Sequence, residues 1–267
     1  MQVYLAVTPK EEQELCRRVR QLAHVAYRIG KGTLLRQELT ASVRGGLLSL
    51  SDRDAPFIPN PEQLATAILR ECAQRGYSGV VADFELPPTP DRIALLRALA
   101  KRSSKSFQLL VPEGCSVPGA TVLINTAVSG GNFSQHLQES IQRYPSAALD
   151  HQRLMMDFTL PAPTGEGKPL SAEDLSSLRK RLGPSVFFSP ELCARYFTYM
   201  QSGQAHFVLY DDAETMQQKM KLAGAMGYRL ALVMYPEVSD LIGQLCPSLR
   251  RICKKKCRTK RCGTGVS

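Results

Sequence analysis

The sequence predicts an α/β fold: a (β/α)8 TIM-like barrel in a single domain, followed by a short basic, cysteine-rich tail. Apolar, strand-like runs alternate with amphipathic, helix-like segments over residues 1–240, a pattern typical of a parallel sheet buried on both faces. Eight or nine candidate strands suit a closed barrel better than an open sheet. No G-x-G-x-x-G follows the first strand, which argues against a dinucleotide-binding domain. We assign residues 1–245 to the barrel and 246–267 to the tail.

Local signals place the elements in order. Apolar residues at helical spacing predict a helix over 11–26, Pro61 and Gly76 suit the two ends of a second, and Ser171 with Asp174 forms a capping-box variant. The expected strands cover 1–9, 45–52, 79–85, 107–113, 121–128, 153–161, 185–190, 205–212 and 228–236. The expected helices cover 11–26, 61–76, 90–102, 132–144, 171–183, 191–201 and 213–227.

The positive charge is concentrated at the C-terminal end. The net charge is +10, and residues 241–267 contain eight Lys and Arg and no Asp or Glu, so the rest of the chain carries only +2. A nearly neutral body disfavours a nucleic-acid partner. The tail is expected either to be a solvated terminus or to contact an anionic polymer.

Cysteine usage divides in the same way. Four cysteines (Cys16, Cys72, Cys115 and Cys193) are scattered and suit small buried apolar positions. Four more (Cys246, Cys253, Cys257 and Cys262) crowd the tail, where their spacing is not that of common zinc modules and disulfides remain an alternative. We expect no metal and no cofactor.

The chain shows no sign of a membrane segment. No apolar run approaches the ~18 residues that span a bilayer, and the first residues lack the basic region and the long apolar stretch of a signal peptide. We therefore expect reduced thiols and a cytoplasmic location, with association with a spore or cell envelope as the alternative.

Asp83 and Glu85 are the leading candidates for catalysis. They close the apolar strand in GYSGVVADFELPP (76–88), and residues two apart on a strand project to the same side. Function in a (β/α)8 barrel lies where strands end, and two neighbouring carboxylates there would have divided pKa values suited to acid catalysis. The alternative is that they are only the polar end of a core strand.

This strand resembles the signature of the family 18 glycoside hydrolases, G-F-D-G-I-D-I-D-W-E. Within 76–85, the positions that match or conservatively replace it are Gly76, Tyr77, Gly79, Val80, Asp83, Phe84 and Glu85. The variant N-I-D-F-E of the spore-cortex N-acetylglucosaminidase branch is closer still to residues 81–85.

A second, later segment also resembles the family. Residues 210–235 are similar to Y-D-D-x-x-S-x3-K-x3-A-x3-G followed by the last barrel strand, with Tyr210, Asp211, Asp212, Thr215, Lys219, Ala223 and Gly227 in the matching places. More weakly, residues 154–158 resemble the family's M-x-Y-D strand and residues 47–52 its S-x-G-G strand. In order, the likeness covers most of residues 1–240.

The resemblance implies substrate-assisted, retaining hydrolysis of β-linked N-acetylglucosamine polymers, peptidoglycan or chitin-like. Glu85 would protonate the glycosidic oxygen, and Asp83 would orient the substrate's own N-acetyl group as the nucleophile. The remaining substrate-binding positions would be Asp52, Met156, Asp157, Tyr210 and Tyr235.

The sequence also departs from the family pattern. The first two aspartates of the signature fall on Ser78 and Val81, and the tyrosine of M-x-Y-D falls on Met156, which cannot donate a hydrogen bond. The chain has no tryptophan, and Tyr235 stands at the end of the last strand. The acid is present while much of its expected support is missing.

Three functions therefore compete. The first is an active, divergent glycosidase, and the second is a catalytically impaired barrel that binds glycan or serves in assembly of a spore or envelope. The third is an unrelated enzyme for a phosphorylated substrate, with SGGNFSQ (129–135) as an anion cradle rather than an ordinary capped turn.

Overall fold

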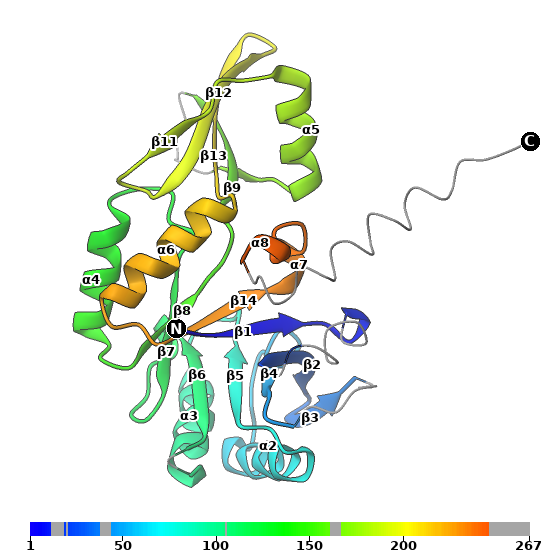
Figure 1. Cartoon of the computed structure of the whole chain (residues 1–267). Helices are drawn as coiled ribbons and strands as arrows, with labels where there is room; N and C mark the ends of the chain where they lie inside the picture. Colours follow the sequence, from blue (N-terminus) through cyan, green and yellow to red (C-terminus); the bar gives the residue numbers. More distant parts are fainter. Residues whose placement is uncertain (12–18, 20, 38–43, 105, 161–166, 246–267) are drawn as a thin grey trace, which may run out of the picture. The chain divides into compact units, whose positions relative to one another are not determined.

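A computed structural model describes residues 1–11, 19, 21–37, 44–104, 106–160 and 167–245 of the chain (Figure 1). These residues form two compact units. The barrel unit comprises residues 1–124, 139–150 and 228–234, and the second unit comprises residues 125–138, 151–227 and the described residues from 235 onward. The predicted tail, with its four cysteines, and Cys16 lie outside the described residues. No helix in the described segments is both long enough and apolar enough to cross a membrane.

Eight parallel strands close into a barrel, which confirms the predicted (β/α)8 class. β1 pairs with both β14 and β2, and this double pairing closes the ring. Around the barrel the strands are β1 (Gln2–Val7), β2 (Leu22–Gly30), β4 (Leu47–Ser51), β5 (Gly79–Asp83), β6 (Gln108–Pro112), β7 (Thr121–Asn125), β8 (Ala147–Asp150) and β14 (Leu230–Met234). The short β3 (Thr33–Arg36) runs antiparallel to β2.

Alternate residues of the barrel strands point into a shared apolar interior. Its buried members are Tyr4, Ala6, Ala23, Leu47, Val81, Leu110, Leu123, Ala148 and Leu232. Asp83 lies two residues after Val81 at the carboxyl end of β5, so it faces the same interior. The predicted placement of this carboxylate at the end of a barrel strand is therefore found in the structure.

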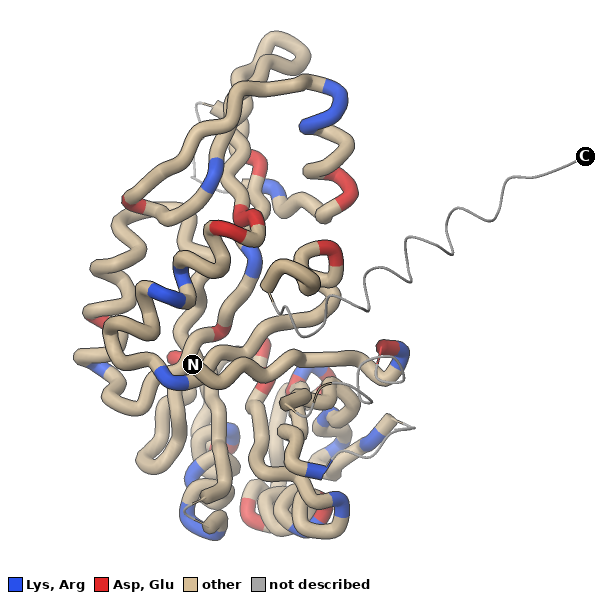
Figure 2. Tube along the Cα trace, viewed as in Figure 1, with Lys and Arg blue, Asp and Glu red and all other residues tan. Residues whose placement is uncertain are grey.

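Two helices of the barrel unit, α2 (Pro61–Arg75) and α3 (Pro90–Arg102), pack against each other. Each has proline in its first turn, where no backbone N–H is needed. α2 ends at Gly76, whose φ of 78° is left-handed and whose N–H donates to the carbonyl of Cys72. Both helices carry charged residues, whereas most of β5 and β6 is uncharged (Figure 2). The 3-10 turn η1 (Glu113–Cys115) follows β6, and α4 (Phe133–Arg143) spans the division between the units.

The second unit is built on a five-stranded antiparallel sheet. Its strands, in spatial order, are β10 (Lys168–Pro169), β9 (Met155–Leu160), β13 (Gln204–Tyr210), β12 (Ala194–Gln201) and β11 (Phe187–Ser189). α5 (Ala172–Leu182) packs on one face, where Leu175 joins Phe197 and Val208 in an apolar cluster (Figure 1). The capping box of Ser171 and Asp174 begins α5, as predicted. The unit also contains α6 (Ala213–Ala225), α7 (Tyr235–Val238) and α8 (Ile242–Leu245).

The prediction that residues 153–161, 185–190 and 205–212 form barrel strands is wrong. They form β9, β11 and β13 of the antiparallel sheet. Their side chains alternate between a face covered by α5 and the other face, and an apolar run alone does not distinguish such a strand from a parallel barrel strand.

The helix predicted over 191–201 is also wrong, because residues 194–201 form β12. Ser202 and Gly203 both have positive φ, and Gln201 pairs with Gln204 across them. This geometry is a two-residue hairpin turn, which requires strands on both sides. Tyr196 stacks on Phe187 of β11 at 5.5 Å between ring centroids, so its aromatic side chain serves cross-strand packing.

At the other end of the chain, the predicted helix over 11–26 is wrong from Leu22 onward, where β2 begins, and residues 12–18 and 20 of it lie outside the described residues. Lys31 and Gly32, again with positive φ, turn β2 into β3. β8 is a barrel strand that the sequence analysis missed, because only four residues (Ala147–Asp150) form it. β2 and β8 thus complete the barrel in place of β9, β11 and β13, which were predicted as barrel strands but belong to the second sheet.

The segment around the Y-D-D sequence forms a buried polar network in the second unit. The Asp211 carboxylate accepts hydrogen bonds from Lys219 Nζ at 2.8 Å, the backbone N–H of Leu154 at 3.0 Å and the Thr215 hydroxyl at 2.9 Å. Lys219 also donates to the carbonyl of Thr126 at 3.0 Å. Asp211 and Lys219 are both fully buried, so each depends on the other for charge compensation.

Lys219→Met should destabilise the second unit by roughly 3–5 kcal/mol, because it leaves the Asp211 carboxylate buried without its counter-charge. Denaturant unfolding measures the loss. The exposed neighbour Lys221 on the same helix gives the matched control, and Lys221→Met should change stability by less than about 0.5 kcal/mol. Equal effects of the two substitutions would contradict a stabilising role for the buried pair.

Candidate active site

The candidate site lies at the carboxyl ends of β4 and β5. Ser51, the last residue of β4, pairs in register with Asp83, the last residue of β5. Asp52 and Glu85 follow directly in the loops after these strands. The parallel arrangement thus brings polar residues about 30 positions apart in sequence to one edge of the barrel.

Asp83 is partly buried, and its environment disfavours the charged form. Burial raises the pKa of the Asp83 carboxyl, and the negative charges of Glu85 and Asp52 raise it further, while Arg53 acts in the opposite direction. A carboxyl placed over an apolar interior keeps its proton to higher pH than one in water. The Asp83 carboxyl therefore binds its proton more tightly than an exposed aspartate does.

Glu85 is more exposed and is held by an arginine. Both of its carboxylate oxygens contact Arg53, with the guanidinium Nη2 at 2.8 and 3.0 Å and Nε at 3.2 Å. The Glu85 side chain is 48% exposed and the Arg53 side chain is 72% exposed. A solvent-exposed ion pair of this kind is weak. The Glu85 carboxylate can therefore exchange Arg53 for another partner at little cost.

Asp52, expected to bind substrate, is instead fully buried and engaged by the protein. One carboxylate oxygen accepts the backbone N–H of Glu85 at 2.8 Å and, more weakly, that of Leu86 at 3.4 Å. The other accepts Arg92 Nε at 2.6 Å. The Arg92 side chain is only 1% exposed. Sequence analysis did not identify Arg92, because on an amphipathic helix an arginine usually lies at the surface.

The other predicted substrate-binding residues belong to the second unit. Met156 and Asp157 lie on β9, and Tyr210 ends β13. Asp157 accepts hydrogen bonds from the Tyr199 hydroxyl at 2.7 Å and shares one with His206 Nδ1 at 3.1 Å. His206 lies on β13, which pairs with β9, and Tyr199 lies on β12, which pairs with β13. Asp157 therefore connects three strands rather than ending a barrel strand.

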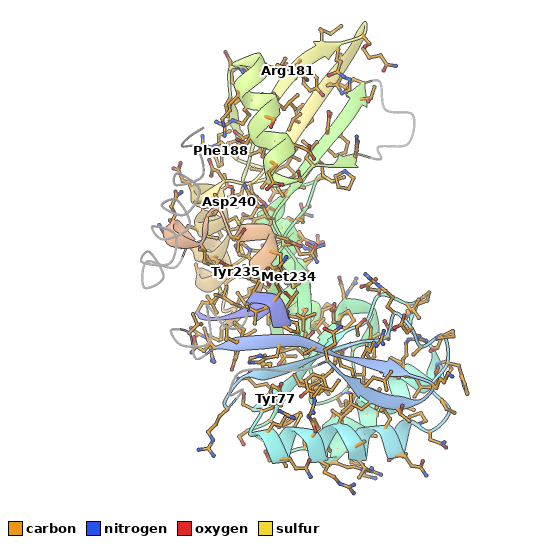
Figure 3. All side chains as sticks on the ribbon, turned by 90° about the vertical axis from the view of Figure 1, so that its right-hand side faces the viewer. Tyr77, Arg181, Phe188, Met234, Tyr235 and Asp240 are labelled. Carbon is orange, nitrogen blue, oxygen red and sulfur yellow. The ribbon has the colours of Figure 1, made fainter. Side chains whose placement is uncertain are left out.

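Tyr210 and Tyr235 are both buried. The Tyr210 ring packs edge-on against Phe197 at 6.0 Å, and the Arg179 guanidinium lies 5.4 Å from its centroid. Tyr235 comes directly after β14, next to Met234, and begins α7 (Figure 3).

Two surface cavities of the second unit are bordered by predicted residues. Tyr210 lines one of about 620 Å³ together with Arg153, Arg179 and Asp240. Met156 lines another of about 400 Å³ together with Asn125 and other residues. The structure thus brings Asp83, Glu85 and Asp52 together in the barrel unit, and places Met156, Asp157 and Tyr210 in the second unit.

The glycine-rich segment 129–135 forms an ordinary capped turn. The Asn132 side chain accepts the backbone N–H of Gln135 at 3.0 Å, and the N–H of Phe133 donates to the carbonyl of Glu191 at 2.8 Å. Because these helix N-terminal N–H groups already have acceptors, the segment offers little to a phosphate. This geometry favours the interpretation of the motif as a capped turn over that as an anion-binding site.

The histidines have structural partners. His151 is buried beside the Thr126 hydroxyl at 3.0 Å. Its burial, together with the charge of Lys219, lowers the pKa of the imidazole to about 4. In the described part of the chain, no cluster of three or more His, Cys, Asp or Glu side chains is arranged to hold a metal ion. Cys72, Cys115 and Cys193 are free and buried, as expected from their scattered positions.

Asp83→Asn should raise the melting temperature at pH 7. The pKa of Asp83 is higher in the folded protein than in the unfolded chain. The folded state is therefore less stable when Asp83 is ionised, and this stability returns as the pH falls to the ordinary pKa of aspartate. The gain from asparagine should therefore disappear near pH 3. Thermal unfolding from pH 3 to 8 measures it, with Asp54→Asn, at an exposed carboxylate paired with Arg28, as the control. A lower melting temperature at pH 7 would contradict this account of Asp83.

No protein-family model matches the sequence, and no curated protein matches it. Solved structures, however, match its fold. The spore cortex-lytic enzyme SleL of Bacillus cereus is 17% identical, with a TM-score of 0.67 over 91% of this chain and 74% of that one. A family 18 glycoside hydrolase N-acetylglucosaminidase from Paenibacillus barengoltzii is 12% identical, with a TM-score of 0.66 over 94% and 99% of the two chains.

A chitinase from Chromobacterium violaceum is similar to a comparable degree. It is 16% identical, with a TM-score of 0.65, and the match covers 93% of this chain and 98% of the chitinase. At such identities the likeness concerns the fold. The chain therefore has the barrel fold of the family 18 glycoside hydrolase structures, as the resemblance in the sequence implies.

Proposed function

We propose that this protein hydrolyses β-linked N-acetylglucosamine polymers, peptidoglycan or chitin-like, at the carboxyl end of its barrel. The observation that carries the proposal is the position of Asp83, which faces the barrel interior at the end of β5 with Glu85 two residues later. The raised pKa of the Asp83 carboxyl supports a functional role, because perturbed carboxylates concentrate at functional sites.

The proposed mechanism is substrate-assisted and retaining. Glu85 protonates the glycosidic oxygen as that bond breaks, while the carbonyl oxygen of the substrate's N-acetyl group attacks the anomeric carbon. Asp83 orients the N-acetyl group and stabilises the positive charge that develops on it. Glu85 then removes a proton from the water that opens the resulting cyclic intermediate, so the configuration at the anomeric carbon is retained.

The substrate class is supported by what the structural neighbours are. One is a chitinase from Cycas revoluta, whose structure was solved as a mutant in complex with (GlcNAc)4. Others are spore cortex-lytic enzymes of Bacillus. We accordingly propose a glycan of a spore, a cell envelope or a chitinous material as the natural polymer. The basic tail (246–267) would add attraction to an anionic polymer.

A second candidate function is glycan binding without hydrolysis. Two observations favour it: Arg53 contacts both oxygens of Glu85, and Val81 occupies the interior beneath Asp83, where the resemblance has an aspartate. Valine cannot exchange a proton or a hydrogen bond with Asp83. In this case the barrel edge would retain glycan, as in an assembly protein of a spore or envelope, without cleaving it.

The decisive experiment measures release of reducing ends from cortex peptidoglycan and from N-acetylglucosamine oligomers. Glu85→Gln should lower the rate by about 10²–10⁴-fold, the usual contribution of a positioned general acid. Glu113→Gln is the matched control, because Glu113 is an exposed carboxylate just after β6, the next strand around the barrel. It should leave the rate unchanged.

Sedimentation with insoluble chitin and peptidoglycan separates the two candidates. Wild-type binding without turnover, equal in the Glu85→Gln protein, would establish the second function in place of the first. If the wild-type protein neither cleaves nor binds any of these polymers, both candidates are wrong.

A further inference from the structure

Among the described residues of the barrel unit, the most deeply buried ion pair, Asp52 with Arg92, connects the loops around the candidate site. Besides its bond to Asp52, Arg92 donates from Nη1 to the Thr89 hydroxyl at 2.7 Å and from Nη2 to the carbonyl of Ala55 at 2.5 Å. Asp52 in turn accepts the backbone N–H groups of Glu85 and Leu86. One ion pair thus joins the loop after β4, the loop after β5 and the start of α3.

Stability alone is a poor explanation for such a pair. Removing two charges from water is costly, and well-packed apolar residues in their place are often neutral or stabilising. The side chains are 0% and 1% exposed, so the desolvation cost applies almost in full. The hydrogen bonds of the pair go mainly to loop backbone, and one of its acceptor oxygens is directed at the candidate acid itself.

We propose that Asp52 and Arg92 are positioning residues for Glu85. Asp52 fixes the backbone N–H of Glu85, and Arg92 holds Asp52 in place and supplies the opposite charge. This inference rests on the function proposed for Glu85, and it assigns Asp52 an indirect role in place of the substrate contact expected from the sequence.

Two consecutive residues, Asp52 and Arg53, contact different parts of Glu85. Asp52, buried and rigidly bonded, holds its backbone, whereas Arg53, 72% exposed, holds its carboxylate. The backbone contact persists in a site shielded from water, and the side-chain contact is exposed and easily exchanged. Glu85 can thus release Arg53 and turn toward a substrate without losing the position of its main chain.

Without the Asp52 carboxylate, the loop after β5 loses the acceptor for the backbone N–H groups of Glu85 and Leu86, and with it the contact that fixes the position of the Glu85 main chain. A displacement of about 1 Å in a reacting group can lower a rate by about 10²-fold. Such a loss appears in kcat rather than in KM when ground-state binding is unchanged.

The test replaces both charges at once with Asp52→Leu/Arg92→Met, because a single substitution would leave an unpaired buried charge and could prevent folding. The double variant should fold with a melting temperature close to that of the wild type. Its amide hydrogens at Glu85 and Leu86 should exchange at least about 10-fold faster, and kcat on N-acetylglucosamine oligomers should fall by about 10²-fold with little change in KM. Arg92→Lys keeps the positive charge but not the planar guanidinium. Its amide exchange at Glu85 and its kcat should lie between those of the wild type and those of the double variant.

The control is an exposed ion pair that joins Asp54 of the loop after β4 to Arg28 of β2. Arg28→Met/Asp54→Leu removes two charges at 2.7 Å without touching the Glu85 backbone, and should alter neither amide exchange at Glu85 nor kcat. Unchanged exchange at Glu85 in the Asp52/Arg92 variant, or a normal kcat there in an active protein, would overturn the positioning role. Absence of turnover in the wild-type protein, in contrast, counts against the proposed hydrolysis.

Discussion

The buried ion pair of Asp52 and Arg92 is the interaction on which the arrangement of the barrel edge depends. It ties together two strand-end loops and the start of a helix, and everything proposed for Glu85 presupposes it. A (β/α)8 barrel supplies rigid strands, but its functional residues stand on the loops that follow them. A buried, charge-compensated ion pair fixes these loops to one another through hydrogen bonds that are shielded from water.

The interior of the barrel sets a second constraint, on Asp83. Val81 and its neighbours make the layer below the carboxyl apolar, so the group is partly desolvated without an acidic partner beneath it. The chain thus places the Asp83 carboxyl where its charged form is disfavoured, two residues before the exposed Glu85. Such local sacrifice of stability is common where a residue serves function rather than packing. The same apolar layer also separates this chain from the family pattern it resembles.

The sequence was sufficient for the barrel class and for the strand that ends at Asp83, because both rest on strong signals: alternating elements and a motif at a strand end. The sequence was insufficient where the structure of a segment depends on pairing with residues distant in the chain. The Ser202–Gly203 turn makes residues 194–201 a strand, although their apolar pattern suits a helix equally well. Met156 and Asp157 were correctly predicted to lie on a strand but were assigned to the barrel, because strands of the second sheet resemble barrel strands in composition. The partnership of Asp52 with Arg92 spans 40 positions, and nothing local announces it.

The central claim is that the carboxyl edge of β4 and β5 is where a glycan chain is received. Backbone amide resonances of the Glu85→Gln protein, followed during titration with an N-acetylglucosamine tetramer, test it most directly. The account predicts that the largest shifts cluster at residues 51–53 and 83–86, which carry the site. Saturable shifts confined to the second unit, or no shifts at all, would contradict it.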